Sequence, residues 1–220
     1  MNESVPSGSA VAGGRKVGRK PAFTADDVVA AAVAEGIDRF KLSAVADRLG
    51  VVTTAIYRLF PSRDDLVLAC LDRAGSTIAL PEPGMHWRDT LKLWGDQCWQ
   101  VCEEFPGLAR VLYSNPIAPT RIEHVFDAYS DNLCTQGRTA GQAMFALDFV
   151  GDTVVASHLG VESMRSVRED GRNGLDAVKD AVGDADVFYS PADSWTGRTM
   201  ADKKVDFIIS GLEQNWPEFY

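Results

Sequence analysis

Two short helical segments on either side of Gly50 most constrain what this chain can fold into. Ser43 is placed to cap the first segment, which ends at Leu49, and the glycine after it can adopt the positive φ that terminates a helix. Thr53 opens the second segment, which we expect to end near Phe60. Two such helices joined by a three-residue turn form a helix-turn-helix unit.

Capped helices are predicted on both sides of this unit. Thr24 and Asp27 have the spacing of a capping box, and an apolar stripe at helical spacing follows them. Ser62 and Asp65 repeat that spacing directly after a proline and open a helix that we expect to reach about Ala79. The sequence thus predicts a compact N-terminal group of helices.

The rest of the chain also reads as helical. After a Pro- and Gly-rich boundary at 79–87, apolar periodicity predicts helices over 88–105, 107–114, 120–136, 139–164 and 200–215. Residues 165–198 are expected to form a long loop with a short helix at 175–182. No convincing strand pattern and no internal repeat occurs, so we expect an all-α fold.

Three regions follow from this pattern. We expect a disordered basic arm, a three-helix DNA-binding domain of helix-turn-helix type that includes the start of a connecting helix, and a larger helical domain, over 1–20, 21–80 and 81–220 respectively. The net charge of −9 is unevenly spread: residues 1–80 hold ten Lys and Arg against nine Asp and Glu, and residues 81–220 hold twelve against twenty-two. Because a phosphate backbone senses charge only within a Debye length of about 8–10 Å, the acidic total does not exclude DNA binding.

Composition excludes several other classes of protein. No run of about 18 apolar residues suggests a membrane span, and the N-terminus lacks the apolar core of a signal peptide. Four cysteines without disulfide spacing suit the cytoplasm. Cys98 and Cys102 lack further ligands at metal spacing, so we expect no metal and no cofactor. No nucleophile elbow, phosphate loop or catalytic acid pair occurs, and we predict no enzyme activity.

The stretch from Phe23 to Asp72 resembles the DNA-binding domain of the tetracycline-repressor (TetR) family. The resemblance is carried by Phe23 with Thr24, by LSAVADRLGV at 42–51 and by IYRLFPSRDDLVLACLD at 56–72. It implies a homodimeric bacterial regulator whose recognition helix enters the major groove of a palindromic operator. The chain departs from the common pattern at Val52, Thr54 and Leu59, so the N-cap of the recognition helix is expected at Thr53 and the operator sequence does not transfer.

The predicted DNA contacts combine this resemblance with helix geometry. Tyr57 and Arg63 resemble the family's backbone-contacting residues, and Arg58 is the candidate for guanine readout, with a phosphate contact or a solvated charge as alternatives. The basic arm can follow the minor groove, or it can serve only solubility. The full set of predicted DNA-binding residues is Arg15, Lys16, Arg19, Lys20, Ser43, Thr53, Thr54, Ala55, Tyr57, Arg58 and Arg63.

The C-terminal domain resembles the regulatory domain of the same family through HWRDTLKLW at 86–94, FPGLARVL at 105–112 and FIISGLE at 207–213. The resemblance implies a dimer interface built from helices near 139–164 and 200–215. Apolar residues nearly encircle the first of these helices, more than one subunit can bury, and this also favours a partner.

Aromatic and cysteine residues at helical spacing predict a cavity for a small, apolar or aromatic ligand, although the same stripes are also typical of plain core. Asp148 and Asp152 interrupt the apolar helix and either hydrogen-bond a ligand or face water. The predicted ligand-binding residues are Trp94, Cys98, Trp99, Cys102, Tyr113, Phe126, Tyr129, Phe145, Asp148, Phe149 and Asp152.

These observations predict a sequence-specific DNA-binding repressor that a small ligand releases from its operator. An activator or a ligand-independent regulator fits the same residues. An all-α enzyme that carries a helix-turn-helix, and a helical protein-interaction module with an incidental basic arm, are the alternatives from other classes.

Overall fold

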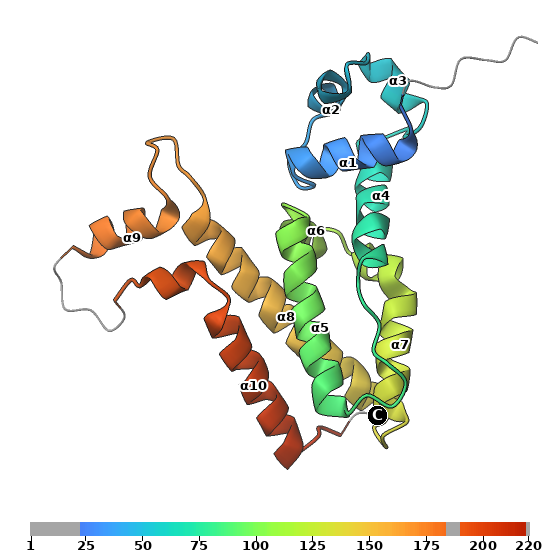
Figure 1. Ribbon diagram of the computed structural model, residues 1–220, viewed down its shortest axis with the longest axis vertical. Coiled ribbons are helices and arrows are strands. Elements are labelled where there is room, and N and C mark those ends of the chain that lie inside the picture. Colours follow the sequence, from blue (N-terminus) through green and yellow to red (C-terminus); the bar gives the residue numbers. More distant parts are fainter. Residues whose placement is uncertain (1–22, 184–189, 219–220) are drawn as a thin grey trace, which may run out of the picture.

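The computed structural model describes residues 23–183 and 190–218, and within these ranges the chain is all-α (Figure 1). The β-structure in these ranges is one isolated antiparallel bridge, between Val167 and Asn173. The helices are α1 Ala25–Glu35, α2 Leu42–Leu49, α3 Thr53–Tyr57, α4 Arg63–Ser76, α5 Trp87–Glu104, α6 Leu108–Ser114, the 3₁₀ helix η1 Ala118–Ile122, α7 Glu123–Cys134, α8 Ala140–Arg165, α9 Gly174–Val182, the 3₁₀ helix η2 Asp193–Thr196 and α10 Thr199–Gln214.

The molecule is elongated, with α1, α2 and α3 at one end and a helical bundle below them (Figure 1). Helix α4 leads from this end into the bundle, where α8 packs against α5, α7 and α10. Helix α9 packs against α8 and η2 at the side of the bundle. The helix-turn-helix unit is therefore carried at the tip of a longer helical body.

Both predicted capping boxes are confirmed. The Asp27 backbone N–H donates to the Thr24 hydroxyl at 3.2 Å, and the Thr24 backbone N–H donates to Asp27 Oδ2 at 2.7 Å. Ser62 and Asp65 form the same pair of bonds at the start of α4. Each box fixes where its helix begins, and together they set the length of chain available for α2 and α3 between them.

The N-caps predicted for α2 and α3 are wrong. Helix α2 starts at Leu42 with Lys41 as its N-cap, so the Ser43 side chain already lies inside the first turn. Helix α3 has Val52, not Thr53, at its N-cap, and it ends at Tyr57 rather than near Phe60. Burial decides the start of α2, because Leu42 packs against the core and such burial outweighs a cap of about 1 kcal/mol.

The turn between α2 and α3 matches its prediction. Gly50 has φ +66° and ψ 32°, the left-handed conformation, and its backbone N–H donates back to the carbonyls of Ala46 and Asp47. The Val51 N–H adds a bond of 3.0 Å to the Ala46 carbonyl. This compact turn holds the two helices at a fixed angle.

A first hydrophobic core lies inside the N-terminal helices, but residues from farther along the chain complete it. Val28, Ile56 and Leu66 are fully buried in it. It also contains residues of α5, α6, η1 and the turn before α6, namely Val101, Phe105, Leu108, Val111 and Ala118. The N-terminal helices are thus packed directly onto the body of the molecule.

A second core fills the bundle around α8. The last helix, α10, contributes its apolar side to this core, because Val205, Ile208, Ile209 and Leu212 are all buried. Although it lacks a long unbroken apolar run, α8 is long and apolar enough in composition to cross a membrane. Its contacts with α5, α7 and α10 make it the central helix of the bundle instead.

Two other boundaries differ from the prediction. The helix expected over 120–136 is divided into η1 and α7, because the Ala118–Ile122 turn tightens to a 3₁₀ helix with a proline in its first positions. The short helix expected in the long loop is present as α9. Helix α4 ends at Ser76, three residues before the expected Ala79, and the remaining predicted helices agree within one or two residues at either end where the structure describes them.

Protonation of His158 is expected to destabilise this bundle. The ring is 6% exposed, packs edge-on against Trp99 at 5.0 Å between centroids, and its Nε2 lies 3.4 Å from a Glu103 oxygen. Burial lowers the pKa of His158 below its ordinary value of 6.5, and the nearby Glu103 only partly offsets this effect. The unfolded chain therefore binds a proton below pH 6.5 before the folded protein does, so stability falls as pH falls through that range, by at most about 1.4 kcal/mol per pH unit.

The measurement is urea unfolding of the wild type and His158→Leu between pH 7.5 and pH 5. We expect the variant to lose part of the wild-type pH dependence, whatever its absolute stability. His124→Leu, at an exposed position of α7, is the matched control. Equal slopes for wild type and His158→Leu would show that this ring does not contribute.

Candidate nucleic-acid interface and ligand cavity

Helix α3 presents a short polar surface at the tip of the molecule (Figure 1). Ile56 is fully buried and anchors α3 to the first core. Thr54 and Arg58 are exposed, and the Tyr57 side chain is half-exposed. A helix held by one apolar residue with polar residues facing outward has the geometry needed to enter a major groove.

The other predicted contact residues lie around this surface to different degrees. Ser43 is exposed in the first turn of α2, while Thr53 and Ala55 are partly buried against neighbouring residues. The predicted arm residues fall outside the described part of the chain: Arg15, Lys16, Arg19 and Lys20.

Arg63 is used inside the protein. Its Nη2 donates to the carbonyls of Asp38 at 2.9 Å and Ile37 at 3.3 Å, and its Nε donates to that of Phe40 at 3.2 Å. The guanidinium also lies over the Phe40 ring, 4.6 Å from its centroid. These contacts fix the turn between α1 and α2. The resemblance had instead implied a contact between Arg63 and the DNA backbone.

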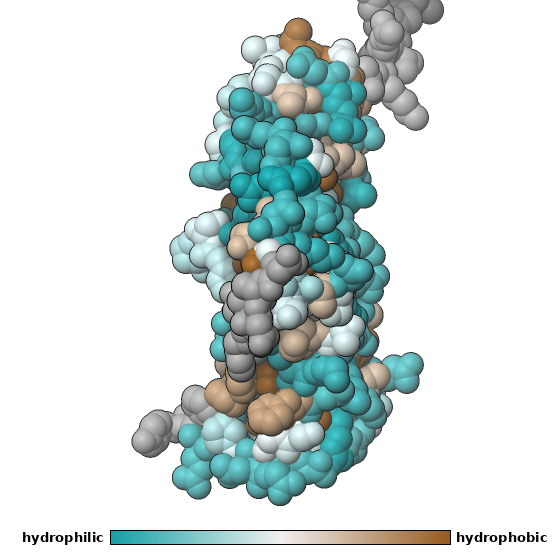
Figure 2. Space-filling model, turned by 90° about the vertical axis from the view of Figure 1, so that its left-hand side faces the viewer, coloured by the Kyte–Doolittle hydropathy of each residue, from teal (hydrophilic) through white to brown (hydrophobic). Residues whose placement is uncertain are grey.

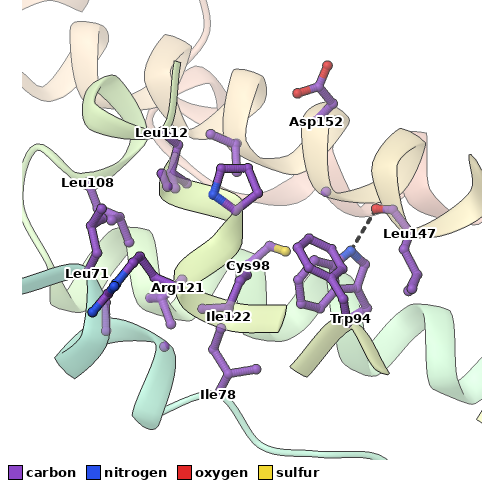
Figure 3. A pocket seen from close by; sticks show the side chains of 18 of the residues that line it. Leu71, Ile78, Trp94, Cys98, Leu108, Leu112, Arg121, Ile122, Leu147 and Asp152 are labelled. Carbon is purple, nitrogen blue, oxygen red and sulfur yellow. Dashed lines mark hydrogen bonds between the residues drawn. The ribbon is translucent and has the colours of Figure 1, made fainter. Parts of the chain in front are cut away.

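A cavity of about 200 Å³ lies inside the body, between α4, α5, α6, η1, α7 and α8, and we call it the bundle cavity. Figure 3 shows Leu71 and Ile78 on one side of it, with Trp94 and Leu147 on the other. The walls are mostly apolar: Leu71, Ala74, Gly75, Ile78, Trp94, Cys98, Val101, Leu108, Leu112, Tyr113, Ala118, Pro119, Arg121, Ile122, Phe126, Leu147, Asp148, Gly151, Asp152 and Val155.

Some of the residues predicted to bind a ligand line this cavity and others do not. Those that line it are Trp94, Cys98, Tyr113, Phe126, Asp148 and Asp152. Trp99 instead packs on His158, Cys102 lies in a small cluster with Ala109 and Val155, and the Tyr129 hydroxyl donates to the Ala79 carbonyl at 2.7 Å. The rings of Phe145 and Phe149 contact each other, 5.6 Å apart, toward α10.

Sequence reasoning missed the wall that α4 and η1 contribute. Leu71, Ala74 and Gly75 of α4 face Ile122, whose Cγ2 would lie only 2.5 Å from a Cβ added at Gly75. The adjacent small residues of α4 were the signal available, because small residues on a helix permit close approach of another element. A search for aromatic residues could not find them.

The polar groups of the cavity gather at one edge. We define the mouth as Tyr113, Asp148 and Asp152, which line the cavity and are each exposed. The Tyr113 hydroxyl donates to Asp152 Oδ1 at 3.1 Å. Burial, with added repulsion from the two aspartates, raises the pKa of Tyr113 to about 12, so this hydroxyl keeps its proton at neutral pH.

Inside the cavity, polar groups are few and already engaged. The Trp94 indole N–H donates to the Leu147 carbonyl at 2.8 Å (Figure 3). Burial raises the pKa of Cys98 well above its ordinary value and that of Cys102 to about 12, which keeps both as thiols. In the described ranges, no group of three or more His, Cys, Asp or Glu side chains is arranged to hold a metal ion.

Helix α4 connects the two candidate sites. Leu66 and Val67 near its start lie in the first core, against the helix-turn-helix unit, and Leu71, Ala74 and Gly75 near its end form the cavity wall. A second link joins the α1–α2 turn to the body: the Ile37 N–H donates to the Pro106 carbonyl at 2.8 Å, and Arg110 lies 3.4 Å from Asp38. Helix α4 thus contributes both to the support of α3 and to the wall of the cavity.

A third surface, the α8–α10 face, is apolar and uncovered. We define it by Phe149 of α8 and Met200 and Phe207 of α10, which are 46%, 59% and 80% exposed. Shallow hollows lie between these side chains. Figure 2 shows apolar side chains in the lower half of the side of the molecule on which α10 lies. Large exposed apolar residues gathered on two adjacent helices are typical of a protein–protein interface.

Comparison with protein families gives a match over the helix-turn-helix region. Residues 23–70 match the family described as bacterial regulatory proteins, tetR family. That range begins at the residue before the Thr24 cap and ends within α4.

A curated relative extends the likeness beyond this domain. The HTH-type transcriptional repressor DrrR1 of Streptomyces coeruleorubidus is 33% identical over 106 residues, which are 46% of this chain. The match spans 39% of that repressor's own length.

Solved structures share the whole fold. A TetR variant from Acinetobacter baumannii AYE, in complex with minocycline, has a TM-score of 0.62 at 22% identity and covers 87% of this chain and 97% of its own. ActR of Streptomyces coelicolor, in complex with actinorhodin, has a TM-score of 0.60 at 21% identity over 89% of this chain and 99% of its own. At such identities the likeness concerns the fold alone.

Proposed function

We propose that this chain, a member of the TetR family of bacterial regulatory proteins through its residues 23–70, is a dimeric repressor that a small ligand releases from its operator. The observation that carries the proposal is the position of α4, whose start supports the helix-turn-helix unit and whose end forms a wall of the bundle cavity. Such a protein acts on DNA in the cytoplasm, where the four free cysteines stay reduced.

The α8–α10 face supports the dimer. Two copies related by a twofold axis would bring this face of each subunit together and bury four helices against one another. The two α3 helices would then address successive major grooves of a palindrome, about 34–36 Å apart. A single subunit has one recognition helix, so the dimer is needed to contact both half-sites.

Release follows from the packing around Gly75. A molecule that enters the cavity must find room against Leu71, Ala74 and Gly75, and Ile122 already contacts this wall closely. Because α4 also carries the first core, its displacement changes the spacing of the two α3 helices. A ligand has this effect only if it binds the state that is unable to bind DNA more tightly than the competent one. Two solved structures of this fold hold small molecules, minocycline and actinorhodin, and this also supports the proposal.

DNA selection from a random pool, followed by salt-dependent affinity measurement on the selected site, tests the DNA-binding half. We expect Arg58→Ala to weaken binding by about 1–3 kcal/mol and to relax the preference at one base pair, because its guanidinium would read a guanine edge. Arg73→Ala, an exposed arginine farther along α4, is the matched control. Failure to select any DNA, or unchanged affinity and preference for Arg58→Ala, would contradict this assignment. A transcription assay on the selected site then separates repression from activation.

A further inference from the structure

We propose that the ligand of the bundle cavity is an aromatic molecule that carries a positive charge. Its ring system would occupy the apolar interior, and its cation would lie at the mouth, beside Asp148 and Asp152. The inference rests on the ligand-binding half of the proposed function and specifies the chemistry of that ligand.

The interior of the cavity selects for a ring without polar groups. Its aromatic walls come from Trp94 and Phe126, and the indole N–H is already bonded to the Leu147 carbonyl. An apolar cavity of about 150 Å³ accommodates benzene, so the 200 Å³ here admits a ring system of one or two fused rings. A polar group placed in this interior would lose its hydration without gaining a partner.

The mouth has the opposite character. Asp148 and Asp152 stand one turn apart on α8, and the ion pairs of the described residues include neither of them. Figure 3 places Asp152 at the rim, outside the apolar interior. Asp152 accepts a hydrogen bond from Tyr113, which neutralises no charge. Like charges at this spacing destabilise a helix, and a cation beside them would offset that repulsion.

The cationic side chain that lines the cavity does not neutralise the two aspartates at the mouth. Within the described ranges, Arg121 is the cationic residue that lines the cavity, and Asp72 holds it through both a 2.6 Å hydrogen bond from Nε and a second bond from Nη2. A ligand cation at the mouth would meet two carboxylates, and the Tyr113 ring beside them offers a cation–π contact. A ligand anion would meet repulsion from both carboxylates. The acidic balance of residues 81–220 favours the approach of a cation as well.

Three probes with one ring system and three charges test the proposal: 1-naphthylmethylammonium, 1-naphthylmethanol and 1-naphthoate. Their affinities for the full-length protein are measured by calorimetry at low and high salt. We expect the ammonium to bind about tenfold or more tightly than the alcohol, and the carboxylate to bind most weakly, because a charge-assisted contact in a partly buried site is stronger than a neutral one. The preference should shrink at high salt.

Asp148→Asn, Asp152→Asn and the double variant identify the source of the preference. We expect the double variant to bind ammonium and alcohol within about twofold of each other, since both carboxylate charges are removed while the size of the two side chains is kept. Asp131→Asn, at an exposed position of α7 that does not line the cavity, is the matched control and should keep the full preference. Thermal melting of each variant verifies the fold.

Several results would overturn the proposal: no binding of any probe, equal or reversed affinities in the wild type, or a preference that survives the double variant. Operator release is measured separately with each probe. A probe that binds with the expected charge preference but does not release the operator would contradict the proposed function and leave the ligand class standing. A neutral or anionic probe that binds more tightly than the ammonium and releases the operator would contradict the ligand class and support the proposed function.

Discussion

Phe207→Asp is expected to convert the protein into a monomer and to abolish its binding to a palindromic operator. The Phe207 side chain is 80% exposed on α10, next to Phe149 of α8, so it has no apolar partner within its own subunit that covers it. In a twofold interface both copies of Phe207 are replaced, so the loss of binding free energy occurs twice. Each copy forfeits about 1.5–3 kcal/mol of apolar burial, and each carboxylate would be buried without a partner at a cost of about 3–5 kcal/mol.

Losses of this size lower the association constant by well over a thousandfold, since each 1.4 kcal/mol is about tenfold. Sedimentation velocity at micromolar protein, with affinity for the selected operator, measures both effects. Leu80→Asp is the matched control, because Leu80 is also an exposed apolar residue, 48% accessible, but lies in the loop after α4. A Phe207→Asp protein that sediments as a dimer and binds the operator normally would show that the α8–α10 face is not the interface.

Gly107→Ala is expected to cause a large loss of stability. Gly107 has φ +85°, and a Cβ there would lie 2.0 Å from Asp38 Oδ1 and 2.9 Å from the Asp38 backbone nitrogen. The left-handed conformation costs alanine about 1–2 kcal/mol, and forcing the α1–α2 turn away from α6 adds about 1–3 kcal/mol. Displacement of the α1–α2 turn would also strain the hydrogen bond from the Ile37 N–H to the Pro106 carbonyl.

The matched control for this prediction is Gly137→Ala. Gly137 has nearly the same backbone conformation, φ +83°, but no atom lies within 4 Å of the position of an added Cβ. Urea unfolding of both variants separates the backbone cost, which they share, from the collision with Asp38. Equal losses for the two variants would mean that the α1–α2 turn yields without cost at this point.

Local signals in the sequence predicted the elements that depend on local chemistry. Thr24, Ser62 and Gly50 each act through neighbours within four residues, so their spacing alone placed the starts of α1 and α4 and the turn before α3. The N-cap of α2 was misplaced by two residues, at Ser43 instead of Lys41, because Leu42 gains more from the core than Ser43 gains from a cap.

The candidate site was less predictable because its walls come from distant segments. Trp94 and Phe126 were found by their aromatic character, whereas Gly75 and Ile122 meet only through the packing of α4 on η1. Arg63 was interpreted from the family pattern as a DNA contact, yet the carbonyls of residues 37–40 engage its Nε and Nη2. No periodicity reveals which carbonyls a side chain will reach across more than twenty residues.

The first core has a consequence for how this chain can be divided. Val101, Phe105, Leu108 and Val111 belong to the body by sequence, yet they complete the core beneath the helix-turn-helix unit. A fragment that ended after α4 would leave that core open to water on one side. The N-terminal helices are therefore not a separable domain, and the two halves of the chain are expected to unfold together as one cooperative unit.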